Sequence, residues 1–449
     1  MKVGKKASTS FVCDNCGSSF ASWFGKCPEC QEWNTLKEFK EPSINPFHSR
    51  NGTNGTTSGK AEFAQLKQFA KNTPDSSRLS SGLAELDRVL GGGFVRDEVI
   101  LLSGEPGVGK STLLITVLSK QALASDNKVA YISSEEAGHQ VEGRCRRLNI
   151  KTDNIFFSSQ KDIDSILEGL SALIAKNKIN LLVFDSLQGL FAANSPGLPG
   201  SVSQAKEVLL KIVNFSKQNK LTSLVIGHIT KEGEIAGPKF LEHMVDCVLF
   251  LEGEQTSNLR ILRSFKNRFG PTEEVGFFEM TQTGMAEVLN PSEFFLEWAD
   301  KAVGKASVAV RQGVRVVFAT VETLVVSSSL AFPKRVAKGV DQKRLELILA
   351  ILKKYLRLAV DKFDIYVNVS GGLKIKDTLA DLGVAVALYS SLTAKAFDPK
   401  HLFIGELGLL GNVRKTNTLA LITKEAKRLG FTKIYSAGQV ATIQNLKQI

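Results

Sequence analysis

The segment Gly104-Glu-Pro-Gly-Val-Gly-Lys-Ser111 matches the pattern G-x-x-x-x-G-K-[ST] and lies directly between an apolar run at residues 99–102 and an amphipathic pattern that begins at Ser111. In this context, glycines let backbone N–H groups wrap around phosphates, and the following helix N-terminus adds a favourable dipole. Lys110 is expected to reach the outer phosphates, and the hydroxyl of Ser111 to ligate Mg²⁺. The sequence therefore predicts a nucleotide-binding loop. The alternative is a glycine-rich turn that binds no nucleotide.

Apolar runs and helical patterns alternate around this loop, from about residue 79 to about residue 280. Strands are predicted at residues 99–102, 129–132, 181–184 and 221–226, and helices from residue 111, at 163–175 and at 205–218. Such alternation favours a parallel sheet with helices on both faces. The predicted fold class is α/β. The last part of the chain also mixes strands, at 314–320 and 364–369, with helices, at 344–355 and 379–392.

A nucleotide site of this kind needs a carboxylate near the metal ion. Asp185 closes the run at residues 181–184 and is the candidate Walker B ligand of Mg²⁺. Glu135 and Glu136 follow the neighbouring strand, where a carboxylate can deprotonate water. The pattern leaves open whether either glutamate acts or is a solvated loop charge. The residues expected to bind ATP and Mg²⁺ are Gly104, Glu105, Pro106, Gly107, Val108, Gly109, Lys110, Ser111, Thr112 and Asp185.

Four of the six cysteines lie in one short block near the start of the chain. Cys13, Cys16, Cys27 and Cys30 form two C-x-x-C pairs, a spacing that can place four thiolates around one zinc ion. Because four sulfur ligands leave no open coordination position, this zinc is expected to be structural. The block at residues 11–36 has too few apolar residues to fold without such a structural metal ion. The alternatives are a redox pair or cysteines without a metal.

The chain has 449 residues, of which 43% are apolar and 23% charged, as expected for a folded, soluble protein of about three domains. It lacks an apolar stretch long enough to cross a membrane and begins with polar residues, so no membrane span or secretion signal is expected. The few cysteines favour a reducing compartment, and we expect a cytoplasmic protein. The predicted domains are a zinc ribbon at 1–36, a flexible linker at 37–75, an ATPase domain at 76–290 and a third domain at 291–449.

Charge is distributed unevenly along the chain. Residues 301–449 hold 24 Lys and Arg against 10 Asp and Glu, a net charge of +14, whereas the preceding residues hold 33 against 35. A basic domain of this kind is expected to contact nucleic acid, since it neutralises phosphates, although many charged residues are plain solvated surface. The candidates for this contact are Lys334, Arg335, Lys338, Lys343, Arg344 and Arg414.

The segment Ser81-Gly-Leu-Ala-Glu-Leu-Asp-Arg-Val-Leu-Gly-Gly-Gly93, followed by the nucleotide loop, resembles the ATPase core of RecA and its relatives. With the four-cysteine block before it and Lys266-Asn-Arg-Phe-Gly270 behind it, the chain resembles the bacterial RadA (Sms) family of DNA repair proteins over nearly its whole length outside the linker. The resemblance implies a hexameric ring ATPase that moves along single-stranded DNA and promotes branch migration beside the RecA recombinase. Glu105 departs from the family pattern, in which Asp is common.

The resemblance also implies roles for single residues. Glu135 matches the glutamate that activates water, and His228 matches a polar sensor at the end of a core strand. Lys266 and Arg268 match a motif that acts across subunit borders, so they would reach the nucleotide of a neighbouring subunit. From the residues alone, the alternative is that this motif is a solvated turn.

Two segments rich in Gly and Pro, at residues 194–203 and 231–239, resemble the DNA-facing loops of the RecA core. Loops in this position can order around single-stranded DNA when nucleotide binds. They can also be plain surface connections, although long loops inside compact domains are more often functional.

The last domain resembles the proteolytic domain of Lon through Asp364-Ile-Tyr-Val-Asn-Val-Ser-Gly-Gly-Leu373 and Gly405-Glu-Leu-Gly-Leu-Leu-Gly-Asn-Val-Arg414. A Lon-type site needs a serine nucleophile and a lysine base. In this sequence, the serine position falls on Leu379 and the lysine position on about Ala420. We therefore expect the Lon-like fold without peptidase activity.

Three functions compete at this point. The motifs and the charge distribution favour a DNA-dependent ATPase that binds single-stranded and branched DNA. An ATP-dependent protease is favoured by the Lon-like segments and opposed by Leu379 and Ala420. An autokinase or signalling ATPase is suggested because clock-type kinases share the Leu-Asp-x-x-Leu-Gly-Gly-Gly segment and the nucleotide loop. That third function leaves the ribbon and the basic domain unexplained.

Overall fold

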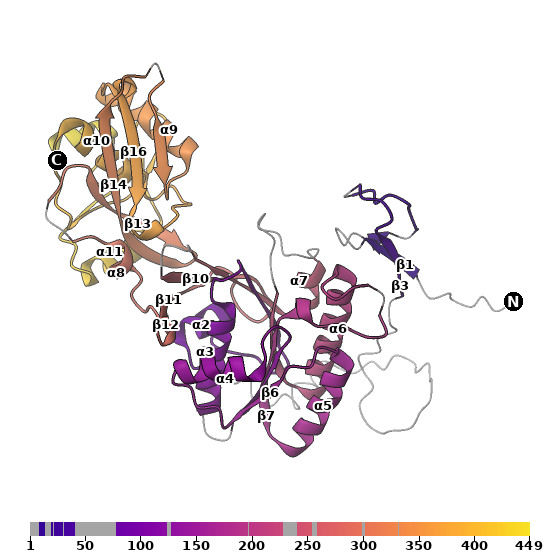
Figure 1. Cartoon of the computed structure of the whole chain (residues 1–449). Coiled ribbons are helices and arrows are strands. Elements are labelled where there is room, and N and C mark those ends of the chain that lie inside the picture. Colours follow the sequence, from indigo (N-terminus) through magenta and orange to yellow (C-terminus); the bar gives the residue numbers. More distant parts are fainter. Residues whose placement is uncertain are drawn as a thin grey trace, which may run out of the picture. The chain divides into compact units, whose positions relative to one another are not determined.

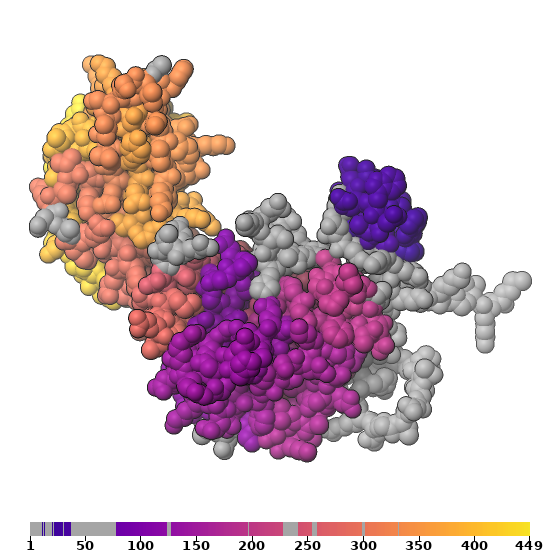
Figure 2. Space-filling view, viewed as in Figure 1, coloured from indigo at the N-terminus to yellow at the C-terminus, as the bar shows by residue number. Residues whose placement is uncertain are grey.

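The computed structural model of the chain describes residues 9–13, 19–20, 22–29, 31–40, 78–123, 127–195, 197–227, 240–253, 258–298, 301–330 and 332–449. These residues divide into two compact units, shown in Figures 1 and 2. The first unit ends at Glu287 and the second begins at Val288, except that Glu273–Phe277 pack with the second. No helix in these ranges is long and apolar enough to span a lipid bilayer. The domain boundaries at residues 36, 75 and 290 stay predictions.

The first residues form a small antiparallel sheet of strand order β2-β1-β3, made of β1 (Thr9–Cys13), β2 (Ser19–Phe20) and β3 (Leu36–Lys40). β3 continues past residue 36, where the linker is predicted to begin, and residues 41–75 of that linker lie outside the described part. The apolar core of this sheet is small, so its sequence needs a further source of stability.

A nine-stranded sheet forms the centre of the first unit, in the order β12-β11-β10-β9-β4-β8-β7-β5-β6. The strands from β9 to β6 run parallel, whereas β10 pairs antiparallel with β9 and β12 with β11. The predicted strands at 99–102, 129–132, 181–184 and 221–226 are confirmed as β4, β5, β7 and β8. The bounds are β4 (Val99–Gly104), β5 (Lys128–Ser133), β6 (Ile155–Ser158), β7 (Ile179–Asp185), β8 (Thr222–Ile226), β9 (Cys247–Glu252), β10 (Leu259–Asn267), β11 (Val275–Thr281) and β12 (Gly284–Glu287).

Helices cover both faces of this sheet, as predicted: α2, α3 and α4 lie over one face, and α5 and α6 over the other (Figure 1). Along β4, Ile100 and Leu102 join the core on the first face, while Val99 and Leu101 join the core on the second, because successive side chains of a strand point to opposite sides. The bounds are α2 (Ala84–Leu90), α3 (Lys110–Leu123), α4 (Gly138–Arg147), α5 (Ile163–Lys176), α6 (Val202–Asn219) and α7 (Phe240–Met244).

The second unit is an α/β fold around a six-stranded sheet of order β15-β16-β14-β13-β17-β20, beside a two-stranded sheet of β18 and β19. The predicted strands and helices of this region are confirmed as β14, β16, α9 and α10, and α10 packs on β13, β14 and β17. The bounds are β13 (Lys305–Gln312), β14 (Arg315–Ser327), β15 (Arg335–Lys338), β16 (Phe363–Val369), β17 (His401–Phe403), β18 (Glu406–Leu407), β19 (Val413–Arg414), β20 (Lys433–Tyr435), α8 (Ser292–Phe295), α9 (Gln342–Ile351), α10 (Asp381–Thr393) and α11 (Leu419–Arg428).

Candidate functional site

The nucleotide loop follows β4 directly and leads into α3. Gly104, Gly107 and Gly109 have φ angles of 153°, 77° and 109°, which residues with a Cβ rarely adopt. At Gly104, an added Cβ would lie 2.4 Å from the carbonyl oxygen of Leu251, and at Gly109 it would lie 2.4 Å from Cε of Met280. The backbone conformation at all three positions, and at Gly104 also the nearby carbonyl of Leu251, therefore require glycine, as a loop that wraps phosphates needs.

Lys110 is the first residue of α3 and points into the loop. Its side chain is buried, and Nζ donates hydrogen bonds to the carbonyl oxygens of Gly104 at 2.8 Å and Glu105 at 3.0 Å. Burial lowers the pKa of this amine, while the charges of Asp185 and Glu135 act to raise it. The structure therefore brings Lys110, Asp185 and Glu135 together from three segments of the chain, as the sequence predicts.

The other residues of the loop differ in exposure. Glu105 and Pro106 are exposed at its tip, Val108 is buried beneath it, and Ser111 and Thr112 are half-buried in the first turn of α3. Neither residue is fully buried. This placement is compatible with the predicted role of Ser111 as a metal ligand.

Arg260 supports the loop from β10, and the sequence patterns do not identify it. Its buried guanidinium donates from Nε to the carbonyl oxygen of Val108 at 2.8 Å. Burial lowers the pKa of Arg260. This arginine fixes the backbone of the loop and adds positive charge beneath it. A single arginine within a strand belongs to no motif, so no signal in the sequence points to it.

Asp185 is the last residue of β7, and a tyrosine holds its carboxylate. The hydroxyl of Tyr131, on the neighbouring strand β5, donates to Oδ2 of Asp185 at 2.6 Å, and both side chains are buried. Burial and the charge of Asp185 raise the pKa of Tyr131, so the hydroxyl stays protonated. Asp185 thus lies at the same carboxyl edge of the sheet as the nucleotide loop, where a carboxylate suits Mg²⁺.

The two glutamates that follow β5 have different surroundings. Glu136 forms an ion pair with Arg144 of α4. Glu135 is exposed and accepts a hydrogen bond from the hydroxyl of Ser186, the residue after Asp185. Of the two, Glu135 is the more exposed and is bonded to the residue next to Asp185. Its role in catalysis stays a prediction.

The residues at this edge of the sheet fit ATP with Mg²⁺. The glycine backbone and Lys110 suit a phosphate chain. The buried amine of Lys110 is bonded to a backbone carbonyl oxygen of the loop, and carboxylates lie nearby. The hydroxyl of Ser111 and the carboxylate of Asp185 are the hard oxygen ligands that Mg²⁺ prefers. The arrangement can therefore bind a nucleoside triphosphate and polarise its outer phosphate.

The Lys266-Asn-Arg-Phe-Gly270 motif lies at the opposite edge of the sheet from the nucleotide loop. The loop begins where Gly104 pairs with Leu251 near the end of β9, whereas Asn267, the second residue of the motif, pairs with Cys247 at the start of β9. At about 3.3 Å per residue, the two levels are separated by about 13 Å along the strand. Within one chain, the motif and the loop therefore face different edges.

Both cations of this motif have partners at their own edge. Nζ of Lys266 donates to the carbonyl oxygens of Glu242 at 2.7 Å and Val245 at 2.8 Å, and burial lowers its pKa. Arg268 is exposed, and its Nη1 lies 3.5 Å from Oδ1 of Asp246. The side chain of Lys266 is thus fixed to backbone carbonyl groups of its own chain, whereas Arg268 makes only a long contact at the surface. Arg268 is therefore the more accessible cation of the motif.

Of the predicted DNA-facing segments, residues 231–239 and His228 lie outside the described residues. The segment 194–203 is described except for residue 196, and the buried Gln204 holds its base. Nε2 of Gln204 donates to the carbonyl oxygen of Ser195 at 2.7 Å, while Leu198 at the tip is 79% exposed. The segment is therefore anchored at its base and open to solvent at its tip.

In the ribbon, Cys13 and Cys27 are fully buried in one cluster with Leu36. Cys16 and Cys30 lie outside the described residues. The backbone N–H of Gln31 donates to the carbonyl oxygen of Cys27 at 3.0 Å, which closes a tight turn after this cysteine. Two thiols that meet at one buried point from separate segments fit a structural zinc site.

In the second unit, apolar packing occupies the position that a Lon-type nucleophile would take. Leu379 is 7% exposed and packs in a core cluster with Ile422 and Phe431. Ala420 is exposed on α11. Neither side chain can attack a carbonyl or accept a proton, so these positions cannot perform Lon-type chemistry.

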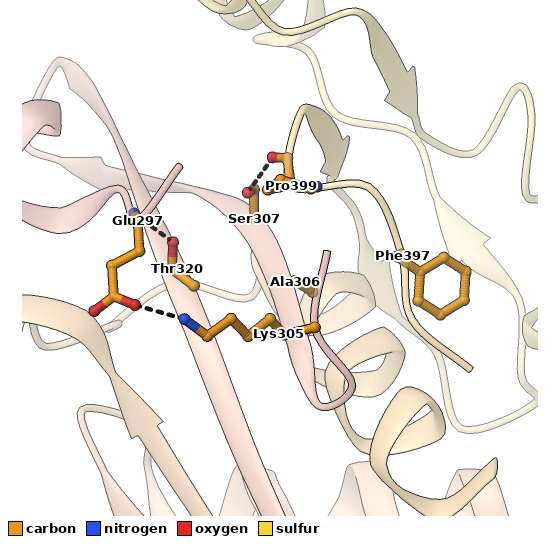
Figure 3. A pocket seen from close by; sticks show the side chains of 8 residues that line it. Glu297, Lys305, Ala306, Ser307, Thr320, Phe397 and Pro399 are labelled. Atoms are coloured by element: carbon orange, nitrogen blue, oxygen red, sulfur yellow. Dashed lines mark hydrogen bonds and ion pairs between the residues drawn. The ribbon is translucent and has the colours of Figure 1, made fainter. Parts of the chain in front are cut away.

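A small cavity of this unit, shown in Figure 3, is also unsuited to a substrate. Its volume is about 10 Å³, which is room for no more than one water molecule. On its wall, Nζ of Lys305 lies 2.7 Å from Oε2 of Glu297 and 3.0 Å from Oε1 of Glu322. The hydrogen bond from Lys305 lowers the pKa of Glu297. This cluster therefore binds β13, β14 and the segment before them to one another.

Three of the basic residues predicted to contact nucleic acid are engaged within the second unit. Arg344 forms an ion pair with the buried Asp381, and Arg414 lies 2.9 Å from Glu406. The guanidinium of Arg335 donates to backbone carbonyl oxygens. The exposed members of the set are Lys334, Lys338, Lys343 and Arg414.

Lys334 and Lys338 border an open face of the sheet. Val336 on β15, Tyr366 on β16 and Leu324 on β14 lie side by side in register. Val336 is 47% exposed and Leu324 60% exposed, so no other described element covers them. An aromatic and apolar surface bordered by lysines is a surface on which the bases of a single strand can stack. We call these five residues the open face.

Comparison with known proteins agrees with this geometry. Residues 11–38 match the family model of the rubredoxin metal binding domain, residues 79–158 that of the KaiC ATPase, and residues 337–438 that of subunit ChlI of Mg-chelatase. Fold and site together define a P-loop ATPase with a parallel-sheet core, preceded by a zinc ribbon and followed by a Lon-like α/β domain.

Relatives along the whole chain identify the family. The chain is 40% identical to DNA repair protein RadA of Listeria monocytogenes, over 96% of this chain and 92% of the relative. It is 40% identical to that of Aquifex aeolicus, over 95% and 93%, and 38% identical to that of Synechocystis, over 95% and 88%. The chain belongs to the RadA family and is a DNA repair ATPase.

Proposed function

We propose that this protein is a DNA-dependent ATPase that translocates on single-stranded DNA and promotes branch migration, as a homohexameric ring that works beside the RecA recombinase. The observation that carries this proposal is the position of the nucleotide loop and the Lys266-Asn-Arg-Phe-Gly270 motif at opposite edges of one sheet. Head-to-tail contacts between identical chains bring such edges together and close into rings. Each nucleotide site would then be completed by residues of the next subunit.

The hydrolysis step follows from the residues at the carboxyl edge. Nζ of Lys110 exchanges its two carbonyl partners for the outer phosphates of ATP. Ser111 and Asp185 would hold Mg²⁺, which would supply neutralisation of the charge on these phosphates. Glu135 accepts a proton from the attacking water. Arg268 of a neighbouring subunit stabilises the charge on the outer phosphate, an effect of about 10³ to 10⁵ in rate for comparable arginines.

DNA contact is proposed for two surfaces. The segment 194–203 begins nine residues after Asp185, so a change at the nucleotide can alter its conformation. The open face on the second unit carries lysines and stacking surface, in a domain with a net charge of +14. The affinity for DNA would thus vary with the state of the bound nucleotide. Movement along a strand requires such a variation.

The experiment that tests this function is steady-state ATP hydrolysis with and without single-stranded DNA, at two salt concentrations. We expect DNA to stimulate hydrolysis, and the stimulation to weaken as salt rises. Lys110→Ala should abolish hydrolysis, while Lys120→Ala, at an exposed lysine of the same helix, should retain it. A rate indifferent to DNA at both salt concentrations would contradict the proposal. Transfer of labelled phosphate to the protein itself would favour an autokinase instead.

Branch migration needs its own assay, because hydrolysis alone does not establish movement. A labelled three-strand junction with RecA should lose its invading strand faster when this protein and ATP are present. The Lys110→Ala chain should give no acceleration. Equal rates with the parent chain and the Lys110→Ala chain would leave a DNA-stimulated ATPase without motor activity.

A further inference from the structure

Tyr131 is linked side chain to side chain with the candidate metal ligand Asp185, although the two lie at different levels of neighbouring strands. In the register of β5 and β7, Tyr131 lies opposite Val183, and Ser133 lies opposite Asp185. The hydroxyl of Tyr131 must therefore reach past two residues, about 6.6 Å along the strand, to the carboxyl edge. A tyrosine side chain is long enough to span this distance. Phenylalanine has the same ring but lacks the hydroxyl that donates the hydrogen bond.

We propose that Tyr131 is the positioning residue of the magnesium site, and that its hydroxyl fixes the carboxylate of Asp185 in the orientation that serves the metal. The proposal rests on the proposed ATPase function. The hydrogen bond of 2.6 Å occupies Oδ2 of Asp185, and the described part of the chain provides no donor to Oδ1. One oxygen is thus held by the protein, and the other is available to the metal or to its water.

The residues packed around Tyr131 hold its hydroxyl in the direction of Asp185. The residue is 1% exposed and belongs to the core cluster of its face of the sheet. Its ring packs against Phe157 with a centroid distance of 6.1 Å. A buried hydroxyl without a partner is costly, so the bond to Asp185 is strongly favoured over an alternative rotamer.

The backbone of Asp185 is fixed independently of this bond. Its carbonyl oxygen accepts a hydrogen bond of 2.7 Å from the backbone N–H of Ser134. The hydroxyl of Tyr131 therefore controls the orientation of the carboxylate, and its removal should leave the strand and the loop in place. Outer contacts of this kind typically change metal affinity 10-fold to 100-fold.

The test is Tyr131→Phe, which removes the hydroxyl and keeps the ring. The Mg²⁺ concentration at half-maximal hydrolysis should rise roughly 10-fold, while kcat at saturating Mg²⁺ stays within about twofold. Electron paramagnetic resonance titration of Mn²⁺ with the ADP-bound protein should show a similar loss of affinity. Binding of fluorescent ADP in EDTA should be unchanged, which also shows that the site is folded. Tyr435→Phe, at a buried tyrosine of the second unit, is the matched control and should change none of these values.

A double-mutant comparison separates positioning from general damage. In an Asp185→Asn background, Tyr131→Phe should have no further effect on Mn²⁺ affinity, because the carboxylate that it orients is gone. An unchanged metal affinity of Tyr131→Phe in the parent chain would overturn the proposal, as would an equal loss in both backgrounds. Mn²⁺ binding needs no hydrolysis and no DNA. A protein whose ATPase ignores DNA would therefore refute the proposed function and leave this result intact.

Discussion

Asp246 divides its carboxylate between two cations from different elements. Its Oδ2 lies 2.8 Å from Nζ of Lys217 in the last turn of α6, and its Oδ1 lies 3.5 Å from Nη1 of Arg268 after β10. The same Oδ2 accepts the backbone N–H of Val99 at 3.1 Å. Since α6 begins at Val202, at the end of the segment 194–203, one helix connects a candidate DNA-facing loop with the carboxylate that holds Arg268.

Arg268 should act on the nucleotide of a neighbouring subunit. Arg268→Ala is expected to lower hydrolysis by about 10³. When Arg268→Ala and Lys110→Ala chains are co-expressed, about a quarter of the borders in a mixed ring combine an intact loop with an intact arginine. Hydrolysis should then return to a measurable fraction of the parent rate. A chain that carries both substitutions, mixed with Arg268→Ala, should restore nothing, and equal rates in the two mixtures would show that Arg268 acts within its own chain.

The open face should contribute to DNA binding. Lys334→Glu with Lys338→Glu is expected to weaken binding of single-stranded DNA and to reduce the slope of affinity against salt by about two phosphate contacts. Fluorescence anisotropy at several salt concentrations measures both quantities. The matched control is Lys400→Glu with Lys433→Glu, which makes the same charge change near the opposite edge strand of the sheet. Equal effects of the two pairs would indicate general charge rather than a specific surface.

The ribbon should depend on zinc. Cys27→Ser is expected to remove the bound zinc and unfold the ribbon, because structural zinc supplies about 10 to 16 kcal/mol in small modules. Atomic absorption gives the zinc content, and limited proteolysis reports the ribbon. Cys145→Ser, at a buried cysteine of α4, should leave the zinc content unchanged. Full zinc content in the Cys27→Ser chain would exclude the predicted ligand set.

Leu379 should be important for stability rather than chemistry. Leu379→Ala removes a buried side chain from the core of the second unit and should cost about 2 to 5 kcal/mol of unfolding free energy. Leu421→Ala, at an exposed leucine of α11, should cost much less. Urea unfolding can be followed by the fluorescence of Trp298, which contacts Phe431 of the same core. Similar midpoints for the two variants would show that position 379 is not part of the core.

Glu98 should make stability depend on pH. Burial raises its pKa from 4.5 to about 7. Between these values the folded chain holds a proton that the unfolded chain has released, so the free energy of unfolding should fall as the pH rises from about 4.5 to about 7. Glu98→Gln removes this dependence, and its stability relative to the parent should increase by up to about 3 kcal/mol at pH 8. Urea unfolding at pH 5 and pH 8 measures the change, with the exposed Glu168→Gln as control; parallel curves for Glu98→Gln and the parent would contradict the expectation.

The sequence predicts those parts of the site that depend on neighbouring residues. The nucleotide loop, Asp185 and the strand–helix alternation are local patterns, and the structure confirms the α/β elements that carry them. Tyr131 and Arg260 were inaccessible to such patterns, because neither belongs to a local motif and the contact of each depends on the register of the sheet. Composition likewise cannot show that Arg344 and Arg414 form ion pairs with neighbouring carboxylates, whereas Lys338 forms none within the described ranges of the chain.

The opposite edges of the sheet have a consequence for how activity depends on concentration. In the proposed ring, a single chain carries half of two different catalytic centres and a complete version of neither. It can bind ATP alone, but turnover belongs to the border between two chains. Dilution below the concentration at which the ring assembles would therefore stop ATP hydrolysis without unfolding the chain. Free subunits in a cell would hold nucleotide without consuming it until a ring closes.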